Sequence, residues 1–174
     1  RVKRAQKESA SLKNLHFKAG SVTEIWESPN TFDAAVCRFV LEHMPHDLAK
    51  TALNEIRRCL RPGGELVVID IDGLFQNLYP RTPRIENFLC LLQKLPNFDM
   101  HVGRKIPSWM AEAGFEDVQW RIDPMEIRGD VLEVEAQLID ERFTQALPLT
   151  AKLLGSEKDA LLLKTEYLDS LRKP

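Results

Sequence analysis

Two stretches decide the fold of this chain: Phe32–His43 (FDAAVCRFVLEH) and Arg61–Asp72 (RPGGELVVIDID). Each contains a short run of consecutive apolar residues, which is typical of a parallel strand covered on both faces by helices. The segment between them carries apolar residues at helical spacing. A strand, a helix and a second strand make one βαβ unit of a parallel sheet. In such sheets ligands bind outside the carboxyl ends of the strands.

The connections inside this unit have local signals of their own. Asp47 follows Pro45 and is predicted to be the N-cap of the helix. Pro62–Gly63 predicts a type II turn ahead of the second strand, because proline fixes φ and glycine supplies a positive φ. The apolar side of the helix comprises Leu48, Ala49, Ala52, Leu53, Ile56, Cys59 and Leu60.

Outside the unit the pattern predicts further strands and helices. Leu15–Lys18 and Val118–Ile122 alternate between apolar and polar residues, which indicates two short strands. Helices are predicted around residues 85–95, over 107–113 with a glycine cap at Gly114, and from residue 131 onward. Ser156 begins a capping box that opens a last helix.

The composition is that of an ordinary soluble globular protein, with 44% hydrophobic and 29% charged residues. Twenty-six acidic and 24 basic side chains give a net charge of −2, which argues against nucleic acid or an anionic membrane as a partner. The three cysteines form no CxxC pair and indicate reduced thiols, hence a cytoplasmic protein. The basic start, Arg1–Arg4, lacks the apolar core of a signal peptide. It also lacks a methionine, so we expect the gene product to begin upstream.

The same two stretches resemble the middle of a class I S-adenosylmethionine-dependent methyltransferase. In that family an "FD" opens the fourth strand, as at Phe32–Asp33, and "LRPGG" leads into the fifth, as at Leu60–Gly64. The "AGF" at Ala113–Phe115 is similar to the family's element before the sixth strand. The resemblance implies an α/β fold: a Rossmann-like, doubly wound sheet, represented here by strands three to six, with added C-terminal helices.

The resemblance also implies a domain organisation. Residues 1–122 are expected to form a partial methyltransferase-like Rossmann domain, within which 74–101 is an acceptor or lid insertion. Residues 123–174 are expected to be a C-terminal helical extension packed on the same domain. The family's glycine-rich loop after strand one and the acid that ends strand two have no counterpart here and should precede Arg1.

The resemblance implies S-adenosylmethionine as cofactor and a small set of binding residues. Gly20, Ser21 and Val22 match the turn after strand three that usually bonds the adenine, with Ser21 in place of the family's acid. Arg38 and Phe39 leave strand four, beside the expected methionine moiety. For Phe39 the alternative is core packing, and for Arg38 it is a solvated surface side chain.

His43 is the candidate catalytic base, because histidine titrates near neutral pH and this one follows the strand-four loop. A structural role at the entry to the helix remains the alternative. His101 is a second histidine that could reach an acceptor, whereas His16 is expected to be structural. Asp70 and Asp72 lie two apart at a strand end and so share a face. A metal site needs more oxygen ligands than these, so no metal ligand is assigned.

The predicted activity is methyl transfer to a small-molecule acceptor, with specificity set by residues 74–101 and the C-terminal helices. The apolar residues expected around the acceptor are Leu74, Phe75, Leu78, Tyr79 and Trp109. A degenerate, non-catalytic methyltransferase-like module is the main alternative, and another Rossmann-like nucleotide binder is a third. The C-terminal helices are interpreted as either a lid or a dimer surface, which leaves a homodimer open.

Overall fold

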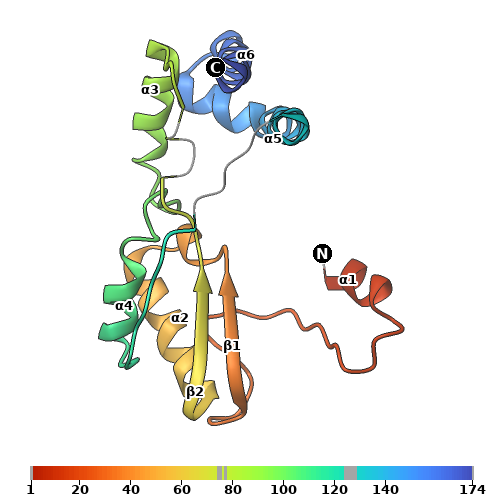
Figure 1. Cartoon of the computed structure of the whole chain (residues 1–174), viewed down its shortest axis with the longest axis vertical. Helices are drawn as coiled ribbons and strands as arrows, with labels where there is room; N and C mark the ends of the chain where they lie inside the picture. Colours follow the sequence, from red (N-terminus) through yellow and green to blue (C-terminus); the bar gives the residue numbers. More distant parts are fainter. Residues whose placement is uncertain (1, 74–75, 77, 124–128, 174) are drawn as a thin grey trace.

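The computed structural model describes residues 2–73, 76, 78–123 and 129–173. Helices and a parallel sheet together make this an α/β fold (Figure 1). The elements are, in order, α1 (Val2–Glu8), β1 (Phe32–Arg38), the 3-10 helix η1 (Leu41–His43), α2 (His46–Cys59), β2 (Leu60–Ile69), α3 (Pro83–Leu92), α4 (Ile106–Glu112), α5 (Asp130–Leu154) and α6 (Glu157–Arg172).

The predicted βαβ unit is confirmed, since β1 and β2 pair in parallel and α2 connects them. The register shifts between Phe32 and Ala34, because residues 61–64 form an irregularity inside β2 and not a turn ahead of it. Gly63 has a φ of +78° there, the left-handed conformation that the predicted turn requires of glycine. The two strands then run in register to their carboxyl ends.

One face of the sheet is buried and the other is bare. The buried face packs on α2 and α4 in a core of Cys37, Leu41, Ala49, Ala52, Leu53, Ile56, Leu60, Val102, Ile106, Trp109 and Ala113. On the opposite face Val36 lies across from Val67, and these side chains are 68% and 51% exposed. No element within the described residues covers this apolar face.

A second core joins α3 to α5 and α6 at the other end of the molecule (Figure 1). The Phe143 ring lies between Phe88, at 6.2 Å, and Tyr167, at 5.3 Å, measured between ring centroids. Two ion pairs reinforce the contact between α3 and α6, because Arg84 binds both Asp159 and Glu166. Thus α3, which lies inside the predicted 74–101 insertion, shares a core with the helices of 123–174. The boundaries at 1–122 and 123–174 stay a prediction.

Two of the three predicted helix caps are confirmed. The Ser156 hydroxyl accepts a hydrogen bond from the Asp159 N–H at 3.2 Å, and Gly114 follows α4 with a φ of +82°. The prediction of Asp47 as N-cap is wrong. The helix already begins at His46, with Pro45 in the cap position and no side-chain cap.

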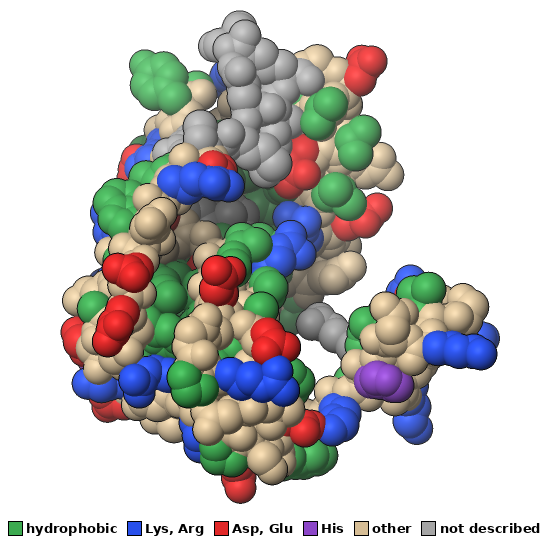
Figure 2. Space-filling view, turned by 60° about the horizontal axis from the view of Figure 1, so that its bottom comes forward, with side chains coloured by type: hydrophobic (Ala, Val, Ile, Leu, Met, Phe, Trp, Pro, Cys, Tyr) green, Lys and Arg blue, Asp and Glu red, His purple; other side chains and the backbone are tan. Residues whose placement is uncertain are grey.

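The predictions of strands at Leu15–Lys18 and Val118–Ile122 are wrong, because neither segment forms regular structure. An extended segment without a pairing partner leaves its backbone groups to water and buries little. Accordingly Leu15 is 44% exposed and Trp120 is 69% exposed. Figure 2 shows the N-terminal segment standing clear of the body of the molecule.

Phe143→Ala should destabilise the chain by about 3–5 kcal/mol, because it opens a cavity between the rings of Phe88 and Tyr167. The matched control, Leu149→Ala, removes a leucine of the same helix that is 54% exposed and should cost less than about 0.5 kcal/mol. Urea denaturation followed by circular dichroism measures both. Equal losses would mean that the α3–α5–α6 core does not form as described.

Candidate functional site

Three acidic side chains gather where β1 and β2 end. Glu42 lies in η1, four residues after the end of β1, and Asp70 directly follows β2, with Asp72 two residues further on. Because the strands are parallel neighbours, both connections leave the sheet at the same edge. This is the edge at which open α/β sheets bind their ligands.

Asp70 ties the two strand exits together. Its Oδ2 accepts a hydrogen bond from the Leu41 N–H at 3.1 Å, and its Oδ1 accepts one from the Ile71 N–H at 2.8 Å. Glu42 lies beside it, 4% exposed, and Glu42 Oε2 is buried with no hydrogen-bond partner in the described part of the chain. Burial, together with the hydrogen bond and negative charge of Asp70, raises the pKa of Glu42 to about 7. The pair therefore takes up a proton as the pH falls through about 7.

Cys37 lies near this pair at the end of β1 but is not a nucleophile. Its side chain is buried, and burial followed by the charges of Asp70 and Glu42 raises the pKa of the thiol to about 11. Only a thiolate attacks efficiently, so the thiol is inert at neutral pH.

Asp72 is held in a different way, by a two-point contact with Arg104. Arg104 Nε and a terminal nitrogen donate to Asp72 Oδ1 and Oδ2 at 2.8 and 3.1 Å, and this hydrogen bonding lowers the pKa of Asp72. His101 Nδ1 is 3.9 Å from Asp72 Oδ1 and is buried with no hydrogen-bond partner in the described residues. Gly103 allows this close packing, because a Cβ there would lie 2.8 Å from the Asp72 Cβ.

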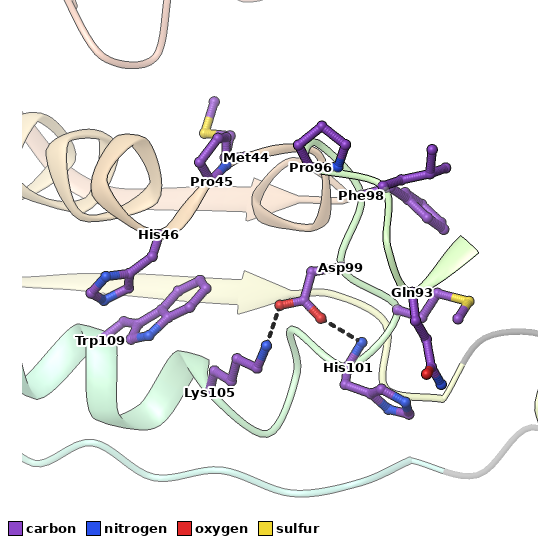
Figure 3. A pocket seen from close by; sticks show the side chains of 12 residues that line it. Met44, Pro45, His46, Gln93, Pro96, Phe98, Asp99, His101, Lys105 and Trp109 are labelled. Atoms are coloured by element: carbon purple, nitrogen blue, oxygen red, sulfur yellow. Dashed lines mark hydrogen bonds and ion pairs between the residues drawn. The ribbon is translucent and has the colours of Figure 1, made fainter. Parts of the chain in front are cut away.

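A cavity of about 450 Å³ opens beside these groups (Figure 3). Its walls come from the start of α2, the segment before α4, and α4 itself. The lining residues are Met44, Pro45, His46, Gln93, Leu95, Pro96, Phe98, Asp99, Met100, His101, Lys105 and Trp109. Of the residues predicted around an acceptor, only Trp109 lines it; Leu78 is buried in the other core, Tyr79 is 86% exposed, and Leu74 and Phe75 lie outside the described residues.

Arg38 and Phe39 stand at the carboxyl end of β1, where the sequence places them. The Arg38 guanidinium lies 4.4 Å from the centroid of the Phe39 ring. Phe39 has a φ of +53°, and its side chain is 44% exposed rather than packed in the core. A strained, exposed aromatic residue at a strand end is a candidate for ligand contact.

The other predicted cofactor residues form a turn on the N-terminal side of β1. The Ser21 hydroxyl accepts a hydrogen bond from the Thr23 N–H and lies 2.7 Å from the Thr23 hydroxyl, so its polar contacts are local. Gly20 is exposed. Val22 packs on the α2 core and, with Arg38, lines a second, largely apolar cavity of about 430 Å³ along β1. The cofactor roles of Gly20, Ser21, Val22, Arg38 and Phe39 stay predictions.

His43 lies at the same strand end, on the surface. Its side chain is 61% exposed, its ring stacks on Phe98 at 5.7 Å, and its Nε2 is 3.6 Å from Glu42 Oε1. His43 therefore borders the cavity without lining it, and its catalytic role stays a prediction. His16 is exposed and distant in sequence from these groups.

The sequence analysis missed Glu42, Asp99 and Lys105. Glu42 carried one usable signal, an acidic residue four residues after a buried strand. Asp99 Oδ1 accepts from the His101 N–H at 2.9 Å, and Asp99 Oδ2 accepts from Lys105 Nζ at 2.5 Å. These contacts depend on how a loop folds and leave no periodic pattern in the sequence.

Comparison with known proteins settles the family. A sequence profile described as "Methyltransferase domain" matches residues 2–120. The chain belongs to the class I S-adenosylmethionine-dependent methyltransferases. The strand ends with their acidic and imidazole side chains are thus the candidate active site of a methyltransferase domain.

Its curated relatives are distant and longer. The chain is 38% identical over 71 residues (40% of this chain, 24% of the relative) to a probable methyltransferase, ltbC, of Aspergillus luteorubrus. It is 30% identical over 109 residues (60% and 37%) to an uncharacterized methyltransferase of Schizosaccharomyces pombe. It is 28% identical over 128 residues (62% and 51%) to a demethylmenaquinone methyltransferase of Renibacterium salmoninarum. The chain thus spans between about a quarter and about half of the length of these relatives.

No group of three or more His, Cys, Asp or Glu side chains in the described part of the methyltransferase chain is placed to hold a metal ion. Nor is any helix there long and apolar enough to cross a membrane.

Glu42→Gln should change how stability depends on pH. A carboxyl with a raised pKa stabilises the folded state while protonated, so wild-type stability should fall as pH rises from about 4.5 through about 7. The amide introduced by the substitution keeps a donor toward Asp70 and cannot ionise. The free energy of unfolding of the variant should therefore rise relative to that of the wild type by roughly 3 kcal/mol between pH 4.5 and pH 7. Urea denaturation at pH 5, 6, 7 and 8 measures this difference. Glu116→Gln, at an exposed site, should show no such trend; parallel curves for Glu42→Gln and wild type would contradict the buried pair.

Proposed function

We propose that this domain transfers a methyl group from S-adenosylmethionine to a small-molecule acceptor at the carboxyl ends of β1 and β2. The observation that carries the proposal is the cavity beside these strand ends, which Phe98 and His101 connect to His43 and Asp72. Membership of the methyltransferase family supports the reaction class. One relative bears the name demethylmenaquinone methyltransferase, which names a small-molecule acceptor and so supports the acceptor class.

The residues at the end of β1 suit the cofactor. When bound, S-adenosylmethionine supplies an electrophilic methyl group for in-line displacement, a reaction in which positioning provides much of the rate. The exposed Arg38 guanidinium suits the carboxylate of its amino-acid part. The exposed ring of Phe39 suits an apolar contact. Gly20, Ser21 and Val22 are proposed to contact the adenine.

His43 is the proposed base for acceptors that must lose a proton. Its imidazole borders the cavity through Phe98 and has Glu42 Oε1 3.6 Å behind it. An imidazole nitrogen can take the proton that such an acceptor loses. We place the reaction in the cytoplasm, which the three free cysteines support.

One observation favours the alternative of a non-catalytic module. The bare face at Val36 and Val67 is the kind of apolar surface that binds another protein. Val131 and Val134 on α5 are also exposed, at 62% and 60%. These exposed apolar side chains support the proposal of a homodimer.

Calorimetric titration with S-adenosylhomocysteine decides between the enzyme and the module. It should be done with the 174-residue chain and with an extended chain if the gene encodes residues upstream. Binding with a Kd on the order of micromolar, equivalent to about −8 kcal/mol, by either chain would support the enzyme. No heat from either chain, with folding verified by circular dichroism, would favour the module.

Phe39→Ala should weaken S-adenosylhomocysteine binding about tenfold, because it removes the exposed ring at the end of β1. Phe32→Ala is the matched control, since Phe32 is 42% exposed at the amino end of the same strand. The same calorimetry measures both, with urea denaturation to compare stability. Unchanged affinity in Phe39→Ala would remove Phe39 from the cofactor site.

His43→Ala should lower kcat by about 10²-fold or more and leave cofactor affinity unchanged if His43 is the base. His16→Ala, another exposed histidine, should have no effect on either quantity. Methyl transfer to the first acceptor identified, measured from pH 5 to 9, provides the readout. If kcat in His43→Ala equals the wild-type value, only a structural role for His43 remains.

A further inference from the structure

The cavity adjoins the reaction edge of the sheet. Phe98 lines it and stacks on His43, with 5.7 Å between ring centroids. His101 also lines it, and its Nδ1 lies 3.9 Å from Asp72 Oδ1 at the end of β2. A molecule seated in the cavity would therefore be separated from each strand exit by one lining side chain.

The walls of the cavity suit a flat, apolar body. Trp109 and Phe98 contribute aromatic rings, and Trp109 is fixed against His46 at 5.0 Å between ring centroids. The remaining apolar lining comprises Met44, Pro45, Leu95, Pro96 and Met100. A volume of about 450 Å³ is within the range of small-molecule pockets and admits one or two fused rings.

The carboxylate in the cavity already has its partners. Asp99 Oδ1 accepts from the His101 N–H at 2.9 Å, and Oδ2 accepts from Lys105 Nζ at 2.5 Å (Figure 3). The nitrogens of His46 also face acids outside the lining, Asp47 at 3.7 Å and Glu112 at 4.0 Å. Neither Asp99 nor His46 is therefore the free polar group of this cavity.

Three polar side chains of the lining can still form hydrogen bonds with a ligand: Lys105, Gln93 and His101. Lys105 uses one of its three N–H groups on Asp99, and its side chain is 46% exposed. The Gln93 amide also lines the cavity, and so does His101, whose buried Nδ1 has no hydrogen-bond partner in the described residues. The Gln93 amide and the His101 ring can each donate or accept, whereas Lys105 is a cationic donor and is satisfied best by an anionic oxygen.

Resting on the methyl transfer proposed above, we infer that this cavity is the acceptor pocket and takes a planar aromatic acceptor that bears an acidic oxygen, held by Lys105. The rings of Trp109 and Phe98 flank the aromatic body. His101 provides a second polar contact on the side nearer Asp72. Flat molecules without an acidic oxygen are bound more weakly, because Lys105 then loses water without gaining a partner.

The probe for this pocket is 1-hydroxy-2-naphthoate. The control compound is 1-hydroxy-2-naphthamide, which has a similar shape but carries an uncharged amide in place of the carboxylate. Titration into the cofactor-free chain, followed by calorimetry, should give saturable binding below about 1 mM for the naphthoate and at least about tenfold weaker binding for the amide. Lys105→Met should weaken naphthoate binding by about tenfold or more. Lys164→Met is the matched control, because Lys164 is also paired with an aspartate, Asp140 at 2.8 Å, but lies on α6.

Tryptophan fluorescence locates the probe independently of Lys105. The naphthoate should quench the wild-type emission, and Trp109→Phe should keep the affinity while losing most of the quenching. This second variant keeps an aromatic wall, so the test survives if Lys105→Met does not fold.

Two outcomes overturn the inference: no binding of the naphthoate up to about 5 mM, or equal affinity in wild type and Lys105→Met with quenching retained in Trp109→Phe. Failure of the proposed function looks different. In that case the naphthoate binds as expected, but S-adenosylhomocysteine binds to neither the 174-residue chain nor an extended one. The cavity then binds an aromatic anion, and its role as the acceptor pocket of a methyltransferase is overturned.

Discussion

The Asp70 carboxylate is the contact on which the geometry of the candidate site depends. One of its oxygens holds the N–H of Leu41 after β1, and the other holds the N–H of Ile71 after β2. The two chain exits therefore cannot move apart without breaking a charge-assisted hydrogen bond in a partly buried place. Burial and the neighbouring Asp70 raise the pKa of Glu42 to about 7, so this second acid loses its proton less readily than an exposed glutamate. His43, adjacent in sequence, is placed at the cavity edge as a result.

The central βαβ unit could be predicted because several local signals agreed there. The apolar runs, the helical spacing between them and the Pro62–Gly63 pair all predict the same unit, and the tertiary packing agrees with these local signals. Leu15–Lys18 and Val118–Ile122 show the limit of such reasoning. An alternating pattern predicts that a segment can be extended. A strand also needs a neighbouring strand with which to form hydrogen bonds, and the pattern does not predict which segment that is. The predicted Asp47 cap lies two residues from the observed cap, because the φ of Pro45 itself suits the cap position.

The candidate site was only partly visible in the sequence. Arg38, Phe39 and His43 were found because strand ends are predictable and ligands gather there. Glu42 was missed because its burial follows from the approach of Asp70, 28 residues later in the chain. The cavity residues Asp99 and Lys105 belong to a segment without periodicity, whose shape is set by contacts such as the hydrogen bond from the Asp99 N–H to the Glu42 carbonyl at 2.7 Å.

The bare face of the sheet has a consequence for how the protein behaves in solution. Val36, Val67 and Ile69 present a contiguous apolar strip, and within the described residues each strand has a single hydrogen-bonded neighbour. Unpaired backbone groups beside exposed apolar side chains favour edge-to-edge association between molecules. We therefore propose that a higher protein or salt concentration favours self-association of the 174-residue chain through this strip, with the helical core intact.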